Sequence, residues 1–265
     1  MPMAVHIALI GLTTVCFLMA IVWIIHLVMK NAGVVDAFWG IGIVVLTAIY
    51  VICGCGFQPR KRMIYLMVAI WGFRLSTHII RRMMQERSED SRYKNIREAW
   101  KTHVPLKFFL FFEFQALLQT VLSVPFLFIC LNKNPSIQWI EWVGAAIWLM
   151  ALLGETIADQ QLKSFRLNPQ NKGKVCNIGL WNYSRHPNYF FEWLVWVGFA
   201  VFALGSPYGW TGIVSCLIML HFLLNVSGVP MAEAQSIKSR GDLYREYQRT
   251  TSIFVPLPKR KVTSS

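Results

Sequence analysis

Residues 179–204 read GLWNYSRHPNYFFEWLVWVGFAVFAL, a polar and aromatic segment joined directly to an apolar run. The apolar run, with its flanks, is long enough to enter a bilayer, whose hydrocarbon core takes about 20 helical residues. A membrane-interface belt explains the Trp, Tyr and Arg residues. Such a belt does not explain Asn188 and Glu192, which are four residues apart on one helical face. Placing polar groups at the membrane end of a helix is energetically unfavourable, so this stretch predicts a functional site there.

Composition indicates a membrane protein. The chain has 265 residues, of which 55% are hydrophobic and only 15% charged, whereas soluble domains have about a quarter charged residues. We expect a single integral membrane domain over 1–265, an all-α polytopic bundle of about seven helices. The first span lacks a signal-peptide cleavage site and predicts a retained anchor. The expected spans are 4–29, 34–56, 63–80, 108–131, 137–154, 190–206 and 209–229.

The net charge of +13 lies in the loops between these spans. In a soluble protein it would suggest a nucleic-acid partner, but here most Lys and Arg residues fall on one side of the predicted membrane. Arg60, Lys61, Arg62 and Lys133 fall on the other side. The positive-inside rule then places the C-terminus in the cytoplasm and the N-terminus outside. We expect contact with anionic lipid and no nucleic acid.

Cysteine and histidine spacing argues against a metal site. The motif Cys53-Gly54-Cys55 is too tight for an ordinary metal knuckle, and no paired CxxC exists. The six histidines form no HxxxH or HExxH pair. The cysteines are expected to act as small apolar residues.

Four hydrophilic segments interrupt the apolar runs, and all lie on the predicted cytoplasmic side. They can converge on one cavity that is open to water at one end and to lipid at the other. Such a cytoplasm-facing cavity suits a hydrophobic substrate together with a polar cofactor. The segments are 30–36, 81–107, 159–188 and 233–249.

The third segment carries cations on both sides of a predicted turn at 168–173. Lys163 and Arg166 precede the turn, and Lys172 and Lys174 follow it. These side chains could grip a di- or triphosphate, and positive-inside charge explains them equally well. Trp181 could stack on a flat ring.

The fourth segment is predicted to form one helix. Arg240, Tyr244 and Tyr247 would then share a face. That face could bind ribose and phosphate, or the helix could lie on the lipid headgroups.

The first two segments contain candidate acids. Tyr93 lies among cations, and nearby positive charge is expected to lower the pKa of its phenol. A mixed charge run is also typical of a solvated face. Asp36 begins a span, where it could cap the helix or line the cavity.

These motifs resemble the steroid 5α-reductase superfamily. The resemblance rests on Gly-Leu-Trp-x-Tyr-Ser-Arg-His-Pro-Asn-Tyr at 179–189, on Val226-Ser227-Gly228, and on Tyr244-x-x-Tyr247. It covers nearly the whole chain and is greatest for an uncharacterised bacterial branch. That branch has motifs like Val35-Asp36-Ala37-Phe38-Trp39-Gly40, Glu89-Asp90-x-Arg92-Tyr93 and Ala158-Asp159-x-Gln161-Leu162. The resemblance therefore implies a bacterial inner-membrane protein.

The superfamily includes two chemistries. Its reductases use NADPH to reduce a carbon–carbon double bond, and its methyltransferases use S-adenosylmethionine. Asn188-Tyr189 is closer to the reductase pattern, and the basic loop suits a phosphorylated dinucleotide. We therefore expect an NADPH-dependent reductase of a steroid, isoprenoid or fatty-acyl substrate. An S-adenosylmethionine-dependent methyltransferase of isoprenylcysteine or phospholipid type is the alternative, and a non-catalytic membrane protein is the second alternative.

A reductase needs a proton donor, for which the polar segments offer acids, and cofactor-binding residues, which the resemblance implies. Tyr93 is the preferred proton donor, Glu89 and Glu192 are the other candidate acids, and Asp36 would orient the substrate. Two positions depart from the family pattern, Phe191 in place of a glycine and Ala232 in place of an aspartate. No metal is implied. The cofactor residues, expected within about 155–255, are Lys163, Arg166, Trp181, Arg185, His186, Asn188, Tyr189, Glu233, Ser236, Arg240, Tyr244 and Tyr247.

Overall fold

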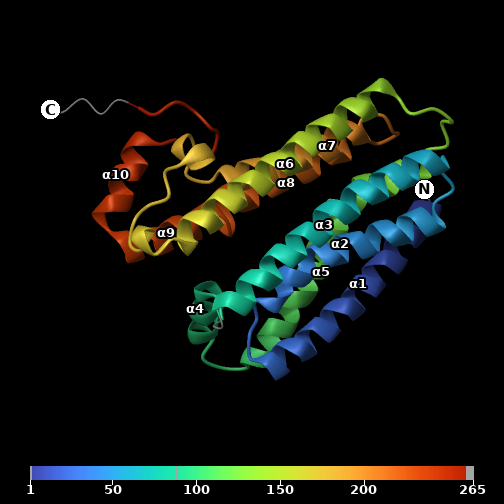
Figure 1. Ribbon diagram of the computed structural model, residues 1–265. Coiled ribbons are helices and arrows are strands. Elements are labelled where there is room, and N and C mark those ends of the chain that lie inside the picture. Colours follow the sequence, from blue (N-terminus) through green and yellow to red (C-terminus); the bar gives the residue numbers. More distant parts are fainter. Residues whose placement is uncertain (1, 87–88, 261–265) are drawn as a thin grey trace. The chain divides into compact units, whose positions relative to one another are not determined.

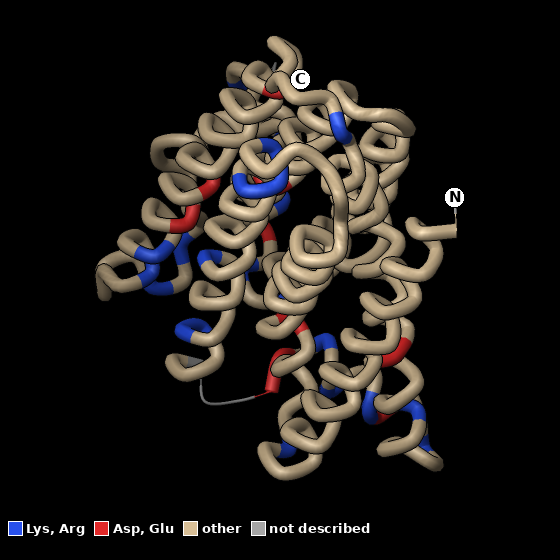
Figure 2. Tube along the Cα trace, turned by 90° about the vertical axis from the view of Figure 1, so that its right-hand side faces the viewer, with Lys and Arg blue, Asp and Glu red and all other residues tan. Residues whose placement is uncertain are grey.

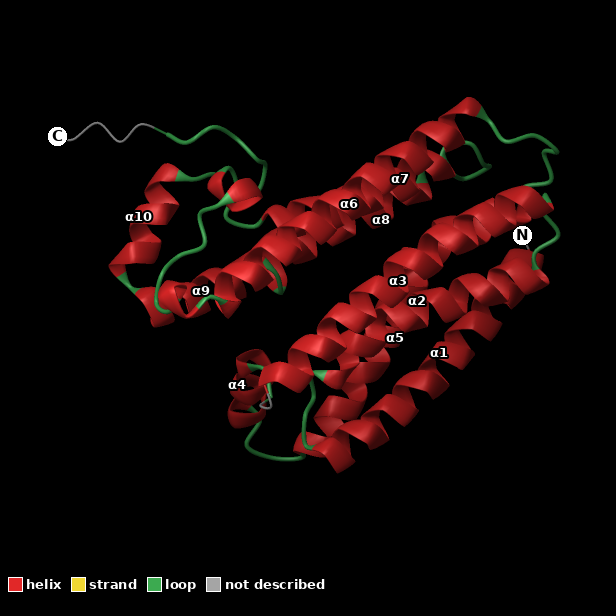
Figure 3. Cartoon of the chain, viewed as in Figure 1, coloured by secondary structure: helices red, strands yellow, loops and turns green. Residues whose placement is uncertain are grey.

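The computed structural model describes residues 2–86 and 89–260. Within these residues the regular structure is helical (Figure 3), apart from one isolated β-bridge between Ser184 and Ser252. The predicted all-α fold is confirmed. Most of the length of the long helices carries no Lys, Arg, Asp or Glu, as the tan tube in Figure 2 shows.

Six helical stretches of the described chain are long and apolar enough to cross a membrane. A seventh helix, α7 (Pro187–Ala203), has 17 residues and follows the polar and aromatic residues 179–186. These helices fit an integral, multi-pass membrane protein. The six stretches are α1 (Pro2–Met29), α2 (Val34–Cys53), α3 (Gln58–Glu86), α5 (Val104–Leu131), α6 (Trp139–Leu167) and the run Thr211–Arg240, which begins with α8 (Thr211–His221).

The chain divides into two compact units, here called unit 1 (Met1–Trp142 and Ala203–Ser215) and unit 2 (Val143–Phe202 and Cys216–Ser265). In unit 1, α1 packs on α2 and α5, and α2 packs on α3 and α5 (Figure 1). Gly40 of α2 and Gly72 of α3 allow these two helices to approach closely, since a Cβ on Gly40 would stand 2.9 Å from the Gly72 carbonyl oxygen. The short helix α4 (Ser91–Ala99) lies beyond the end of α3.

Two cations that opposed the positive-inside pattern are buried in unit 1. Arg60 donates from Nε to Glu141 Oε1 at 2.5 Å and from Nη1 to the Asn134 carbonyl at 2.8 Å. Lys61 Nζ donates to the carbonyls of Val51 and Gly54, at 2.9 and 2.7 Å. Both charges bind helix ends and loop carbonyls inside the protein, so they carry little information about the side of the membrane.

Unit 2 contains the larger part of α6, then α7, the end of α8, α9 (Val229–Arg240) and α10 (Asp242–Thr250). Two short turns join α6 to α7, and the predicted turn is confirmed by the first, at Pro169–Asn171. Between α8 and α9 lies a π-helical turn, Phe222–Val226.

The expectation of one helix over 233–249 is wrong. Gly241 has φ +55°, a left-handed conformation that glycine adopts without steric cost, and it separates α9 from α10. Arg240 therefore lies on a different helix from Tyr244 and Tyr247, and the three residues do not share a helical face.

Candidate functional site

The segment before α7 is fixed to the C-terminal part of unit 2. Ser184 Oγ donates to the Phe254 carbonyl at 2.7 Å, and the Arg185 N–H donates to the Ser252 carbonyl at 2.8 Å. Tyr247 donates from its hydroxyl to the carbonyls of Trp181 and Ser184. Residues 181–186 and 247–254, far apart in sequence, are thus held together by backbone and side-chain hydrogen bonds.

A single carboxylate organises the centre of this region. Arg185 Nε donates to Glu233 Oε1 at 2.6 Å, and His186 Nε2 lies 3.3 Å from the same oxygen. Tyr244 donates to it at 3.4 Å, and Gln248 Nε2 donates to Oε2 at 2.8 Å. We call these five residues the Glu233 cluster. Arg185 is also bound by the carbonyls of Gln248 and Thr251, both at 2.9 Å, so its charge is fully engaged.

The two tyrosines of α10 are buried and neutral. Burial and the Glu233 charge raise the pKa of Tyr244, which also lies near Ser236. Burial, followed by the neighbouring Tyr244, raises the pKa of Tyr247. Both phenols therefore act as hydrogen-bond donors near neutral pH, where an unshifted phenol is already protonated.

Cations from two segments meet beside Cys176. Arg240 Nε donates to the Lys174 carbonyl at 2.9 Å. Burial raises the pKa of the Cys176 thiol, and the charges of Arg166 and Arg240 both act to lower it. We call Arg166, Lys174 and Arg240 the basic rim. Lys163 and Lys172 are exposed on the same two elements, the end of α6 and the loop that follows it.

The motif Ala158-Asp159-x-Gln161 of α6 holds the segment in front of α7. Trp181 Nε1 donates to the Ala158 carbonyl at 2.9 Å, and the Leu180 N–H donates to Gln161 Oε1 at 2.9 Å. Asn188 Nδ2 donates to Asp159 Oδ1 at 3.3 Å. The sequence shows this motif but gives no sign of the role of its residues.

The aromatic and acidic side chains before and within the start of α7 are largely packed against other side chains. The His186 and Tyr189 rings are parallel within 5°, with centroids 5.4 Å apart. Trp181 is only 8% exposed, so little of its ring is open for stacking on a cofactor. Glu192 is buried and accepts a hydrogen bond from Trp196 Nε1 at 3.1 Å.

The departure at Phe191 has a local explanation. A Cβ at Gly154 of α6 would clash with the Phe191 ring. The Phe191 ring therefore packs against α6 at a position that only glycine leaves open.

Unit 1 has a second polar group of side chains, at the start of α2 and in α4. Tyr93 donates to Asp36 Oδ1 at 2.7 Å, and Arg92 Nη2 donates to Asp36 Oδ2 at 2.7 Å. Arg92 also binds Asp90, whose side chain accepts from the Arg92 N–H and so caps α4. We call Asp36, Asp90, Arg92 and Tyr93 the Asp36 cluster.

The expected lowering of the pKa of Tyr93 is wrong. Tyr93 is 4% exposed, and burial together with the Asp36 charge raises its pKa in spite of Arg92. The sequence shows the cations near Tyr93, but it does not show that a carboxylate 57 residues away accepts a hydrogen bond from the Tyr93 hydroxyl.

Glu89 is held as a carboxylate. Arg97 Nη2 and the Ala32 N–H each donate to its Oε1 at 2.8 Å. Burial alone would raise the pKa of Glu89, but these hydrogen bonds and the Arg97 charge bring it below the ordinary value. An ionised carboxylate has no proton to give at neutral pH, so Glu89 is a poor proton donor.

Comparison with known proteins fixes the family. The model of a protein family of unknown function, DUF1295, matches residues 22–251. The chain belongs to the DUF1295 family. It is 25% identical over 281 aligned positions to an uncharacterized protein of Schizosaccharomyces pombe, an alignment that covers 93% of this chain and 79% of that protein. No solved structure matches.

The DUF1295 match contains every predicted site residue. The fold places them in two sets, one in each unit. Unit 2 brings together Arg185, His186, Glu233 and Tyr244, and it brings Arg240 to the basic loop. Unit 1 brings Tyr93 to Asp36 and places Glu89 on Arg97.

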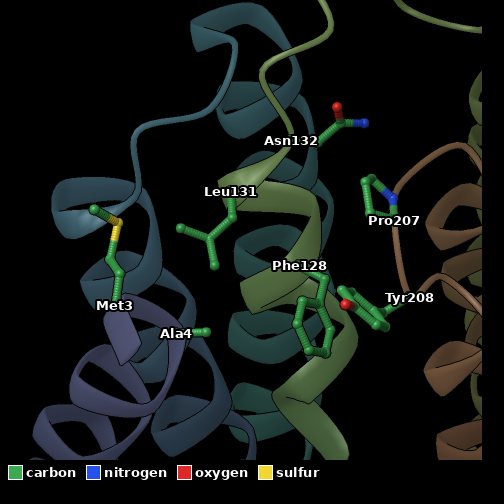
Figure 4. A pocket seen from close by; sticks show the side chains of 7 residues that line it. All are labelled: Met3, Ala4, Phe128, Leu131, Asn132, Pro207 and Tyr208. Carbon is green, nitrogen blue, oxygen red and sulfur yellow. The ribbon is translucent and has the colours of Figure 1, made fainter. Parts of the chain in front are cut away.

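A small apolar cavity of about 220 Å³ lies elsewhere in unit 1 of this DUF1295 protein. Figure 4 shows its lining, and none of the predicted site residues takes part in it. Among residues 2–86 and 89–260, no group of three or more His, Cys, Asp and Glu side chains is arranged to hold a metal ion. The cavity is lined by Met3, Ala4, Phe128, Leu131, Asn132, Pro207 and Tyr208.

Proposed function

We propose that this DUF1295 protein is a membrane-embedded reductase that uses NADPH to reduce a carbon–carbon double bond in a steroid, isoprenoid or fatty-acyl substrate. The observation that carries the proposal is the basic rim. Arg240 of α9 donates to the Lys174 backbone carbonyl. The charges of Arg240 and of Arg166 in α6 both act to lower the pKa of the Cys176 thiol. Two arginines 74 residues apart in sequence thus lie near the Cys176 thiol, and one of them binds the basic loop.

Phosphate is the ligand that suits such a rim. Arginine binds phosphate oxygens with two parallel N–H donors, and lysine adds a compact charge. NADPH has a pyrophosphate and a ribose phosphate, whereas S-adenosylmethionine has none. Within the superfamily that the chain resembles, Asn188-Tyr189 is closer to the reductase pattern, which also supports reduction.

The Glu233 cluster is proposed to support the cofactor site. Its carboxylate fixes Arg185 and His186 in front of α7 and Tyr244 on α10. The basic rim joins the same α9 to the loop after α6. Glu233 and Arg185 would therefore position the cofactor-binding residues and not bind phosphate themselves, because their charges neutralise each other.

The Asp36 cluster is proposed to supply the proton. When bound, NADPH provides a hydride for one carbon of the double bond. Within unit 1, Tyr93 is the proposed donor of the proton that the reduction needs. Its raised pKa keeps the proton on the phenol until transfer. Arg92, whose guanidinium carbon lies 5.4 Å from the Tyr93 ring centroid, would stabilise the resulting phenolate.

Thermal unfolding of the detergent-purified protein tests the cofactor. A ligand that binds only the native state raises its stability, by about 2.7 kcal/mol at a concentration of 100 Kd. We expect NADPH to raise the midpoint at concentrations where NADH, which lacks the ribose phosphate, has little effect. Stabilisation by S-adenosylmethionine but not by NADPH would favour the methyltransferase. No response to either ligand would favour a non-catalytic protein.

A further inference from the structure

The end of α2 and the loop that follows it expose two cysteines, one of which lies beside a methionine of α1. Cys53 ends α2, and Cys55 follows after one glycine; both side chains are exposed. Met3 is 52% exposed, and its Sδ lies 3.9 Å from Cys55 Sγ. These three sulfur atoms belong to unit 1 and take no part in the proposed reductase chemistry.

The loop backbone is fixed in a way that directs the cysteines outward. The Gly54 N–H donates to the Tyr50 carbonyl at 2.8 Å, and the Gly56 N–H donates to the Cys130 carbonyl at 2.9 Å. A Cβ on either glycine would stand 2.5 Å from the Cys130 carbonyl oxygen. The glycines of Cys-Gly-Cys-Gly thus press against the end of α5, and the alternate residues are left on the outside.

The 3.9 Å between Met3 Sδ and Cys55 Sγ matches the separation of two sulfur ligands on one metal ion. Sulfur atoms about 2.3 Å from an ion, at trigonal or tetrahedral angles, stand roughly 3.8–4.0 Å apart. Cα atoms two residues apart are separated by at most about 7 Å, so Cys53 and Cys55 can reach the same ion. We propose that Cys53, Cys55 and Met3 form a three-sulfur site for Cu(I).

Ligand softness and charge select Cu(I) among the common metals. Thiolate together with thioether sulfur favours Cu(I), whereas Zn²⁺ is usually completed by His or carboxylate ligands. Cu(I) with two thiolates and a neutral thioether carries one net negative charge. The Lys61 ammonium, 2.7 Å from the carbonyl oxygen of Gly54 between the two cysteines, offsets it. Binding releases the thiol protons, so affinity rises with pH.

Competition for Cu(I) tests the site. The full-length protein, reduced and kept in detergent without oxygen, is titrated with the coloured Cu(I) complex of bicinchoninate. We expect it to withdraw one equivalent of Cu(I). The double variant Cys53→Ser/Cys55→Ser should withdraw none at this site. Met3→Leu should lower the affinity for Cu(I) at least about tenfold. Loss of a residue that only supports a metal ligand already lowers metal affinity by about this factor, and Met3 is proposed to be a ligand itself.

The control is Cys216→Ala, which removes a buried thiol of α8 and should withdraw Cu(I) like the wild type. X-ray absorption of the copper-loaded protein should show three sulfur neighbours. The proposal is overturned if the wild type leaves the bicinchoninate complex intact, or if the double variant withdraws as much Cu(I) as the wild type. An unchanged affinity in Met3→Leu would equally overturn the three-sulfur site.

Discussion

The Asp36 cluster of unit 1 and the Glu233 cluster of unit 2 use the same three groups, a carboxylate, an arginine and a tyrosine. The arginine contacts are alike, at 2.7 Å for Arg92 to Asp36 and 2.6 Å for Arg185 to Glu233. The tyrosine contacts differ, at 2.7 Å for Tyr93 to Asp36 and 3.4 Å for Tyr244 to Glu233.

The number of partners explains the difference. Glu233 also contacts His186 and Gln248, and its side chain is 14% exposed. It joins three segments of unit 2, so a structural role suits it. The Asp36 side chain is 29% exposed and holds a short hydrogen bond from a buried phenol. A buried phenol that is hydrogen-bonded to a partly exposed carboxylate is an arrangement suited to proton transfer.

Removing the Glu233 carboxylate should have the largest effect. Glu233→Ala leaves Arg185 buried without its counter-charge, and breaking a buried pair in this way costs about 3–5 kcal/mol. We expect a large fall in the unfolding midpoint and loss of NADPH binding. Glu246→Ala is the matched control, because Glu246 and Arg249 form an exposed pair 3.5 Å apart. Equal stability of the two variants would contradict the structural role of Glu233.

Tyr93→Phe should separate chemistry from binding. Loss of a general acid typically slows a reaction by 10²–10⁴-fold, so turnover should fall by about that factor while NADPH affinity stays the same. The measurement needs a reducible substrate and NADPH oxidation as the readout. Tyr208→Phe, at an exposed tyrosine of unit 1, should behave as the wild type. Unchanged turnover in Tyr93→Phe would remove Tyr93 from the mechanism and leave Glu192 as the next acid to test.

Arg240→Gln should weaken NADPH binding selectively. A hydrogen bond to a charged group contributes about 1.5–3 kcal/mol, which is roughly 10–100-fold in affinity. The loss should be smaller for NADH if Arg240 contacts the ribose phosphate. Arg245→Gln, which removes an exposed cation paired with Asp242, serves as the control. The basic rim would lose its proposed role if both variants bound NADPH equally.

The smallest effect concerns Glu89 and acid stability. Because the pKa of Glu89 is below its ordinary value of 4.5 in the folded protein, its carboxylate stabilises the fold above that pH. This contribution is lost as the pH falls through the lower, folded-state pKa. Glu89→Gln should therefore flatten the loss of stability below about pH 4.5, measured as unfolding midpoints against pH. If Glu89→Gln left the unfolding midpoints at acid pH unchanged, the contact between Glu89 and Arg97 would add no stability.

The sequence predicted the helices because their apolar runs exceed the thickness of a bilayer, which leaves few other folds. It also predicted the turn at 168–173 from its Asn, Pro and Gly residues. It missed the break at Gly241, because a single glycine within a polar, helix-like pattern gives no sign of its φ angle.

The sequence named most residues of the two clusters as candidates, but not Asp90, Arg92 or Gln248, and it predicted none of the pairings. Arg185 and Glu233 each appeared in a motif, yet their contact joins positions 48 residues apart. The pKa of Tyr93 was predicted from its neighbours in sequence, whereas burial and Asp36 decide it. Asp159 and Gln161 lay in a recognised motif, but only their contacts with Asn188 and Leu180 give them a role.

Direct binding of the two candidate cofactors to one preparation tests the central claim. The purified protein is dialysed to equilibrium against NADPH and, separately, against S-adenosylmethionine, with Arg240→Gln measured beside it. We predict that the wild type binds NADPH and does not bind S-adenosylmethionine, and that Arg240→Gln binds NADPH at least about tenfold more weakly. Binding of S-adenosylmethionine without binding of NADPH would contradict the proposal of a reductase.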